Sequence, residues 1–204
     1  MRTEARTLGP LSPRTISVPV NRYVTYALIV IAGVAVDLSS KSAVFAALHF
    51  PGMVEVGKLG HLVDFSLQTS INQGALWGFG QGWTSLFAIL SVAAVAGIIY
   101  FLFIARHAHS KWLTVALALV TAGALGNLYD RLGLHGLTTR NGASIYGVRD
   151  FLDFVFFETF HWATFNIADS MLVAGSIMLV IYSFRTVPAE NSHPAEPGLA
   201  INTQ

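Results

Sequence analysis

The sequence has 204 residues, of which 53% are hydrophobic and only 11% are charged, and its mean hydropathy is +0.58. Charged residues make up about 25% of an ordinary soluble domain, so this composition predicts a protein that lies mostly in lipid. The net charge of +1 and the lack of basic stretches with interleaved aromatic residues exclude a nucleic-acid-binding protein. The absence of Cys excludes disulfides, thiolate metal sites and a cysteine nucleophile.

Four segments are long and apolar enough to cross a bilayer, which takes roughly 20 residues of helix. The expected helices cover residues 23–41, 83–105, 112–129 and 165–184. The first is expected to be a retained helix and not a signal peptide, because no small-residue cleavage site follows it. The pattern predicts an all-α membrane protein with one four-helix membrane domain over residues 23–185.

The two ends of the chain are expected to be disordered tails. Residues 1–22 include three Pro, and residues 186–204 are polar, so neither segment has the apolar content of a packed core. Lys and Arg accumulate on the cytoplasmic side of membrane helices. With four crossings, seven basic residues fall on the side of the termini and five on the other side. This bias predicts that both termini are cytoplasmic.

Two segments between the helices are too long for simple turns and are expected on the extracytoplasmic side. Residues 50–82 contain the alternating sequence Val63–Gln68, which predicts a strand and a small β-sheet on the outer surface. Within residues 131–164, the Thr-, Gly- and Asn-rich segment Leu137–Gly147 predicts a loop, and an interfacial helix is expected after it, among the lipid headgroups. The apolar residues expected to seat that helix are Phe151, Phe154, Phe156 and Phe157.

Polar residues gather at one membrane face once the helices are given alternating directions. The first helix runs outward and carries Asp37 about 24 Å from Asn21, at about 1.5 Å per residue. The second helix follows the sequence Asn-Gln-Gly, the third ends in Asn-Leu-Tyr-Asp-Arg and the fourth begins with Asn-Ile-Ala-Asp. Ionisable residues in or near membrane spans are costly, so they usually mark function or are paired. Convergence from four segments predicts a functional site at the outer face.

Each of these residues also has a structural interpretation. Asp37 and Lys41 lie four residues apart on a helix and would neutralise each other. Asp130 and Arg131 would form an ion pair at the outer end of the third helix, and we expect Asp130 to be structural. Asn127 would form a hydrogen bond between helices.

Five blocks of polar and small residues follow one another in a fixed order. In chain order they are Asp37–Lys41 (D-x-x-x-K), Asn72–Ala75 (N-x-G-A), Ala122–Arg131 (AGALGNLYDR), Val148–Phe151 (V-x-D-F) and Phe165–Ser170 (FNIADS). Together they resemble the lipoprotein signal peptidase family, also called signal peptidase II. The succession of GNxxDR, V-x-D-F and FNxAD is highly specific, although the stretch between the first two is longer here than is usual in that family.

The resemblance implies a multi-pass aspartic endopeptidase of the bacterial cytoplasmic (inner) membrane, with Asp150 and Asp169 as the catalytic pair on the extracytoplasmic face. Its substrates would be prolipoproteins that carry diacylglyceryl on a Cys, held in membrane lipid and cleaved just before that Cys. The resemblance implies no cofactor, no metal and no obligate protein partner. The residues that it implies in substrate binding or site support are Asp37, Lys41, Asn72, Gly74, Asn127, Arg131, Asn166 and Ala168.

Two carboxyl groups are sufficient for peptide hydrolysis without a metal. One group takes a proton from water while the other donates one to the peptide. Because like charges resist double ionisation, a close pair shares one proton and titrates as a unit, so neither Asp150 nor Asp169 is permanently the acid. Asn166 is expected to orient the pair by hydrogen bonding. Without the resemblance, Asp150 would be interpreted as a loop carboxylate or a helix cap.

Other functions leave weaker signals. A zinc protease is disfavoured because His107 and His109 lack an HExxH pattern and fall on the cytoplasmic side. A Ser-Lys hydrolase that uses Ser39 or Ser40 with Lys41 is disfavoured because neighbouring residues on a helix point in different directions. The strongest alternative is a small four-helix ion-coupled transporter, since membrane carboxylates also line ion paths. It predicts polar residues at the bilayer midplane, where the second and fourth helices are almost wholly apolar.

Overall fold

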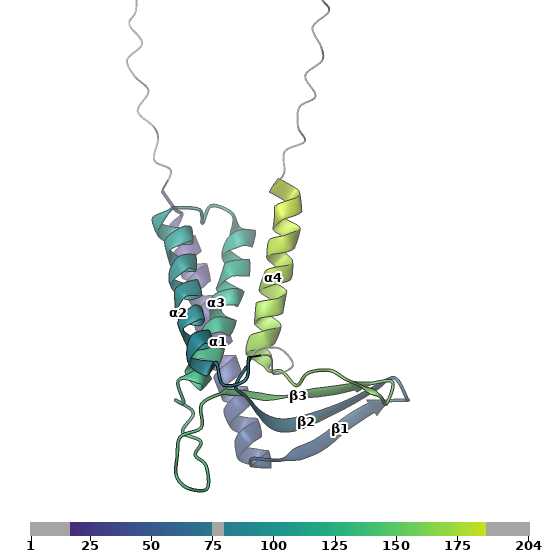
Figure 1. Cartoon of the computed structure of the whole chain (residues 1–204). Helices are drawn as coiled ribbons and strands as arrows, with labels where there is room; N and C mark the ends of the chain where they lie inside the picture. The colour runs from purple at the N-terminus through teal and green to yellow at the C-terminus, as the bar shows by residue number, and fades with distance from the viewer. Residues whose placement is uncertain (1–16, 75–79, 187–204) are drawn as a thin grey trace, which may run out of the picture.

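Four long helices stand side by side, and a β-sheet projects sideways from one end of them (Figure 1). The structure, a computed structural model, describes residues 17–74 and 80–186. In this part of the chain, four helical spans are long and apolar enough to cross a membrane, which confirms the four predicted helices. They are α1 (Val20–Leu48), α2 (Thr84–Ile99) with its π-helical continuation η2 (Tyr100–Ile104), α3 (Lys111–Arg131) and α4 (Ile167–Thr186).

Local sequence explains where the helices begin and end. Helix α1 follows Pro19 and ends before His49, whose φ of 59° breaks the helical path. Helix α3 begins after Ser110, whose side chain accepts a hydrogen bond from the Leu113 amide at 3.3 Å and so caps the first turn. After α3, Gly133 has a φ of +70°, a left-handed conformation that glycine adopts without steric cost. Most of residues 1–22 and 186–204 lie outside the described residues.

Helix α3 is the central helix. Half of its most apolar 18-residue segment is buried, against 11–17% of the corresponding segments of the other three spans. Helix α3 packs against α1, α2 and α4. Polar side chains join the helices at two points: the Tyr26 hydroxyl donates to Thr121 Oγ1 at 2.9 Å, and Trp112 Nε1 donates to the Met178 carbonyl at 2.8 Å. The remaining apolar surface of α1, α2 and α4 is exposed, which in water would be an aggregation hazard but suits contact with lipid.

The outer segments form one antiparallel sheet in the order β1-β2-β3-β4. Its strands are β1 (Met53–Leu59), β2 (Val63–Asn72), β3 (Val148–Phe156) and β4 (Phe160–His161). The predicted small sheet is therefore confirmed. The all-α class is not confirmed, because the chain combines four helices with a four-stranded sheet.

The predicted interfacial helix is wrong. Phe151, Phe154 and Phe156 belong to strand β3, and Phe157 has a positive φ of 53° just after it. The reason is pairing with β2: Phe154 lies opposite Phe65, and the two rings stack at 4.7 Å between centroids, a cross-strand contact of the kind that stabilises sheets. The loop predicted over Leu137–Gly147 is confirmed apart from a single bridge within it.

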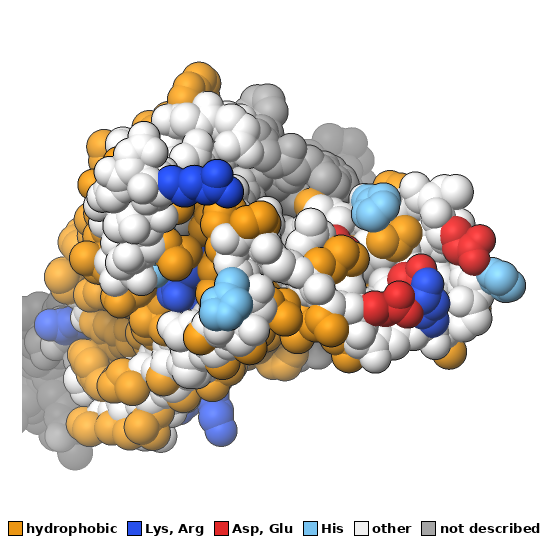
Figure 2. Space-filling model, turned by 90° about the horizontal axis from the view of Figure 1, so that it is seen from below, with side chains coloured by type: hydrophobic (Ala, Val, Ile, Leu, Met, Phe, Trp, Pro, Cys, Tyr) orange, Lys and Arg blue, Asp and Glu red, His pale blue; other side chains and the backbone are white. Residues whose placement is uncertain are grey.

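The two faces of the sheet differ in polarity, because successive side chains of a strand point to opposite sides. On one face, Phe154 also stacks on Phe165, next to the start of α4, at 5.8 Å. Figure 2 views the molecule from the sheet end and shows acidic, basic and histidine side chains together over the distal part of the sheet. The pairs involved are Lys58 with Glu55 and Asp64, and His61 with Glu158. The apolar face is formed by Val63, Phe65, Leu67, Leu152, Phe154 and Phe156.

A β-bulge divides β2 into a distal and a proximal half. Leu67 lies opposite Leu152, but Ser70 lies opposite Asp150, so β2 has one more residue than β3 in this interval. The hydroxyl of Thr69, within the bulge, donates to the carbonyl of His49 at the end of α1 at 2.9 Å. This contact fixes the proximal half of the sheet against the helix ends.

Candidate active site

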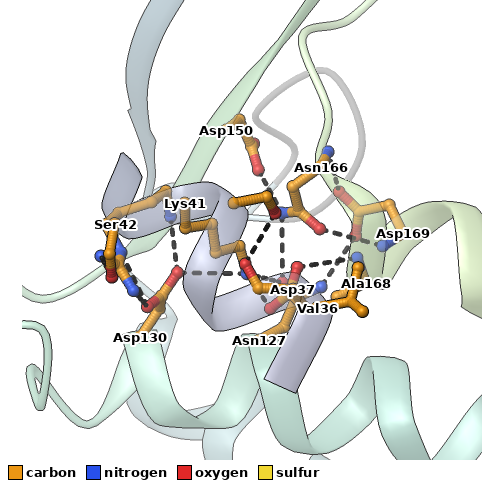
Figure 3. Close-up of polar contacts among 12 residues, drawn as sticks. Val36, Asp37, Lys41, Ser42, Asn127, Asp130, Asp150, Asn166, Ala168 and Asp169 are labelled. Carbon is orange, nitrogen blue, oxygen red and sulfur yellow. Dashed lines mark hydrogen bonds and ion pairs between the residues drawn. The ribbon is translucent and has the colours of Figure 1, made fainter. Parts of the chain in front are cut away.

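The structure brings together polar residues from all four predicted clusters, at the junction of the helices and the sheet. They come from α1, from the end of β2, from the last turns of α3, from the start of β3 and from the first turn of α4. Figure 3 shows those that come from α1, α3, β3 and α4. The predicted convergence at one end of the bundle is therefore confirmed.

Asp169 is fixed by the capping of α4. The Asn166 side chain accepts a hydrogen bond from the Asp169 amide at 3.0 Å, and the Asp169 carboxylate accepts one from the Asn166 amide at 3.2 Å. This reciprocal arrangement is a capping box, which satisfies two donors of the first helical turn. Asn127 Nδ2 donates to the other carboxylate oxygen at 2.8 Å. The sequence Asn-Ile-Ala-Asp thus starts helix α4 and also fixes the orientation of the Asp169 carboxylate.

Asp150 reaches the same point from the sheet. Its side chain is only 2% exposed, and it accepts hydrogen bonds from Asn166 Nδ2 at 2.6 Å and from the Asn72 side chain. Asn166 therefore contacts both carboxylates, through its side chain at Asp150 and through its backbone amide at Asp169. The predicted role of Asn166 as a hydrogen-bonding partner of both aspartates agrees with this geometry.

Burial and, to a smaller extent, the nearby Asp169 carboxylate raise the pKa of Asp150 to about 7, although hydrogen bonds from Asn166 and Asn72 oppose the shift. A carboxyl group with this pKa is half protonated near neutral pH. The pair Asp150 and Asp169 can then hold one proton between them, as acid–base catalysis by two carboxyl groups requires.

We expect peptide cleavage to decline as the pH rises above about 7. Asp150 is protonated below its pKa of about 7 and ionised above it. If Asp150 and Asp169 are the catalytic acid and base, raising the pH removes their shared proton and leaves no acid to protonate the leaving nitrogen. The measured kcat/KM should fall by about tenfold per pH unit on this limb. Substrate binding measured over the same range is the control. A kcat/KM that stays constant from about pH 6 to 9 would contradict the shared-proton arrangement.

A buried ion-pair network lies beside the two aspartates. Lys41 Nζ lies 2.8 Å from Asp37 Oδ2 and 3.2 Å from Asp130 Oδ2, and all three side chains are fully buried. Lys41 also donates to Asn127 Oδ1 at 3.0 Å, so the network reaches the residue that contacts Asp169. The predicted pairing of Asp37 with Lys41 is confirmed. Figure 3 shows Lys41 between Asp130 and Asp37.

The predicted pairing of Asp130 with Arg131 is wrong. Asp130 binds Lys41 and Arg149 instead: Arg149 Nη2 lies 2.9 Å and Nε 3.0 Å from Asp130 Oδ1. The physical reason is that adjacent residues on a helix point in different directions, so Asp130 faces the buried network while Arg131 faces the cleft.

Small residues permit this packing. Asp37 Oδ1 accepts a hydrogen bond from the Ala168 amide at 2.9 Å, which ties α1 to the first turn of α4. A Cβ atom at Gly126 would collide with the Asp37 carboxylate and contact Ala168. Neither Gly126, the glycine of the GNxxDR motif, nor Arg149 was among the predicted site residues. The position of Arg149 inside the V-x-D-F block, next to Asp150, was a sequence signal that could have identified it.

A cleft of about 710 Å³ opens at the two aspartates. Arg131 lies on its wall, where Nη2 donates to the Gly74 carbonyl at 3.4 Å and the guanidinium lies 5.5 Å from the centre of the Phe87 ring. The cleft extends between helices, and its apolar walls come from α2, α3 and α4. The apolar residues of those helices that line it include Phe87, Leu90, Val120, Leu172 and Val173.

The predicted site residues thus have two locations. Asn72, Gly74, Asn127, Arg131, Asp150 and Asp169 line the cleft. Asp37, Lys41, Asn166 and Ala168 lie behind it and are fully buried. Over residues 17–74 and 80–186, no group of three or more His, Cys, Asp or Glu side chains is arranged to hold a metal ion.

Comparison with known proteins gives the family. The model of the family described as signal peptidase (SPase) II matches residues 29–185. A curated lipoprotein signal peptidase of Rhodopirellula baltica is 41% identical over 182 residues, which cover 88% of this chain and 80% of that protein. One of Streptomyces coelicolor is 36% identical over 149 residues, which cover 73% of this chain and 65% of that protein.

A solved structure described as a bacterial membrane enzyme determined by the in meso method has a TM-score of 0.63 and 26% sequence identity, and the match covers 87% of this chain and 95% of the other. These similarities do not support the ion-coupled transporter. With four membrane-spanning helices and matches to signal peptidases over most of its length, the chain is a multi-pass membrane peptidase that belongs to the signal peptidase II family.

Proposed function

We propose that this signal peptidase is an aspartic endopeptidase in which Asp150 and Asp169 hydrolyse the peptide bond. Its substrates are prolipoproteins with diacylglyceryl on their Cys, and cleavage occurs just before that residue. The observation that carries the mechanism is the contact of Asn166 with both carboxylates, at 2.6 Å and 3.2 Å, beside a cleft that can hold a peptide.

Hydrolysis needs a water molecule bound between the two carboxyl groups. The ionised aspartate accepts a proton from this water as its oxygen attacks the scissile carbonyl carbon, and the protonated aspartate donates to the carbonyl oxygen. Collapse of the tetrahedral intermediate then breaks the C–N bond: the aspartate that took the proton from water donates it to the leaving nitrogen, and the other aspartate takes a proton from a hydroxyl group of the intermediate. Asn166 keeps both carboxyl groups in place while their protonation states exchange.

The cleft suits a substrate with acyl chains. Its polar end contains Asp150, Asp169 and Arg131, and its walls between the helices are apolar. Acyl chains bound along these walls stay in the bilayer, while the adjacent peptide bond lies at the carboxyl groups. One site therefore recognises the lipid and the peptide together, which favours lipidated over unmodified precursors.

The site is proposed to face the extracytoplasmic side. Phe154, on the apolar face of the sheet, stacks on Phe165 next to the start of α4. The start of α1 and the end of α4 lie at the far end from the sheet (Figure 1). Together with the Lys and Arg bias, this supports cytoplasmic termini. We expect a reporter enzyme fused at residue 60 or residue 140 to be active outside the cytoplasm. Cytoplasmic activity of either fusion would contradict this orientation.

The function is tested by incubating the purified chain in detergent with a diacylglyceryl-modified prolipoprotein. We expect cleavage immediately before the modified Cys, continued cleavage in a metal chelator and in serine-directed reagents, and much slower cleavage of the unmodified precursor. The same preparation with Asp150→Asn is the control for contaminating proteases. Loss of cleavage in chelator that zinc restores would exclude the two-aspartate mechanism, and equal cleavage of both precursors would exclude lipid recognition.

A further inference from the structure

We infer that Arg149 is a positioning residue, which fixes the strand that carries Asp150 relative to Asp169. The inference rests on the proposed function, and it concerns a side chain that lies between Val148 and Asp150 without contacting the cleft.

Arg149 joins β3 directly to the end of α3. Its side chain donates from Nε and Nη2 to Asp130 Oδ1, at 3.0 Å and 2.9 Å, and its backbone amide donates to Asp130 Oδ2 at 3.0 Å. The single carboxylate of Asp130 therefore holds both the side chain and the backbone of the residue next to Asp150. A displacement of β3 along the sheet would break all three contacts.

The same side chain also joins β3 to α1. Arg149 Nη1 donates to Ser42 Oγ at 3.3 Å, and the guanidinium lies 6.0 Å from the centre of the Phe45 ring. Because successive residues of a strand point to opposite sides, Arg149 is held on one side of β3 while Asp150 faces the cleft on the other. Only 4% of Arg149 is exposed, so its contacts with the fully buried Asp130 are screened from water.

The contacts continue from Arg149 to the second aspartate. Asp130 binds Lys41 at 3.2 Å, Lys41 donates to Asn127 at 3.0 Å, and Asn127 donates to Asp169 at 2.8 Å. Arg149 therefore has a direct backbone link to Asp150 and a path of consecutive contacts to Asp169. One connected set of contacts therefore holds both carboxyl groups, and Arg149 is its member on strand β3.

The geometry requires arginine and not only a positive charge. A guanidinium contacts a carboxylate from two nitrogens and leaves a third for another partner, whereas the lysine ammonium is a single compact group on a flexible stem. Lysine at position 149 would preserve the charge that balances Asp130 and lose the fixed geometry. The pair of variants Arg149→Lys and Arg149→Gln therefore separates positioning from charge.

The test compares the full-length chain in detergent with Arg149→Lys, Arg149→Gln and, as a matched control, Arg140→Gln in the exposed loop. Cleavage kinetics on diacylated prolipoprotein are measured together with hydrogen–deuterium exchange of the amides around Val148–Phe151. We expect kcat to fall about tenfold or more in both Arg149 variants, since a reacting group misplaced by about 1 Å costs up to about 100-fold. KM should change less than about threefold, and exchange should be faster in both.

Arg149→Lys is expected to melt close to the unchanged protein, which keeps the test informative if Arg149→Gln folds poorly. Unchanged kcat in Arg149→Lys would overturn the inference, as would an equal loss in Arg140→Gln. A loss of activity that only follows the fraction of folded protein would also overturn it. If the unchanged protein fails to cleave, the proposed function fails, and the exchange data alone decide: faster exchange in the Arg149 variants supports the inference and unchanged exchange overturns it.

Discussion

Replacement of either Asp150 or Asp169 by Asn is expected to abolish cleavage while the protein stays folded and binds lipidated substrate. An amide has nearly the size of a carboxylate, so the packing around Asn166 and Asn127 should be preserved. However, it can neither accept the proton of water nor hold the shared proton. Loss of a required acid or base typically lowers kcat by about 10²- to 10⁴-fold.

The double variant should be scarcely slower than either single one. Two groups that act as one catalytic unit lose its activity when either is removed, so removing the second costs little more. Single-turnover cleavage and retention of substrate are measured for both single variants and the double in the same detergent. Near-normal turnover by either folded single variant would remove that aspartate from the mechanism. Multiplicative losses in the double variant would show that the two carboxyl groups act independently.

Replacement of Lys41 by Met is expected to cause a large loss of stability. Met fills a similar volume without the charge, so Asp37 and Asp130 lose the cation at 2.8 Å and 3.2 Å. In the described part of the chain, Asp37 Oδ2 has no hydrogen bond to compensate for that loss. Removing one partner of a buried ion pair typically costs about 3–5 kcal/mol, which is comparable to the whole stability of a marginal domain.

Lys58→Met is the matched control. Lys58 also lies near two carboxylates, Glu55 at 3.7 Å and Asp64 at 3.4 Å, but its side chain is 51% exposed. Exposed ion pairs contribute little to stability because water and salt screen them, so this variant should unfold close to the unchanged protein. Thermal unfolding in detergent and the yield of folded protein are measured for both. Equal stability of the two variants would show that burial of the Lys41 network contributes little.

The helices and the convergence of polar residues were predictable because they depend on local or directional features. A run of about 20 apolar residues specifies a membrane helix whatever its neighbours are, and alternating helix directions place Asp37, Asn127 and Asp169 at the same end. The Asn-x-x-Asp sequence before α4 is likewise a local signal, since a capping box is formed by residues three positions apart.

Strand β3 was not predictable in the same way. Phe151 and Phe154 are three residues apart, which fits one face of a helix as well as it fits a strand with aromatic side chains on both sides. The contact that decides between them is the pairing of β3 with β2, whose partners are 76 (Asn72 and Val148) to 93 (Val63 and Phe156) positions apart in the sequence. The ion-pair partners of Asp130 were missed for the same reason. The sequence favoured its neighbour Arg131, but the fold places Lys41 and Arg149 beside it instead.

The bulge in β2 allows one strand to serve two environments. Before it, the odd-numbered residues Val63, Phe65 and Leu67 share the apolar face with Phe154; after it, Ser70 and Asn72 take that face, opposite Asp150 and Val148. In an unbroken strand, Asn72 would point to the other side, away from Asp150. The extra residue thus changes the phase of the strand: odd-numbered positions form the apolar face before the bulge, and even-numbered positions, which include Asn72, lie on that face beside Asp150 after it.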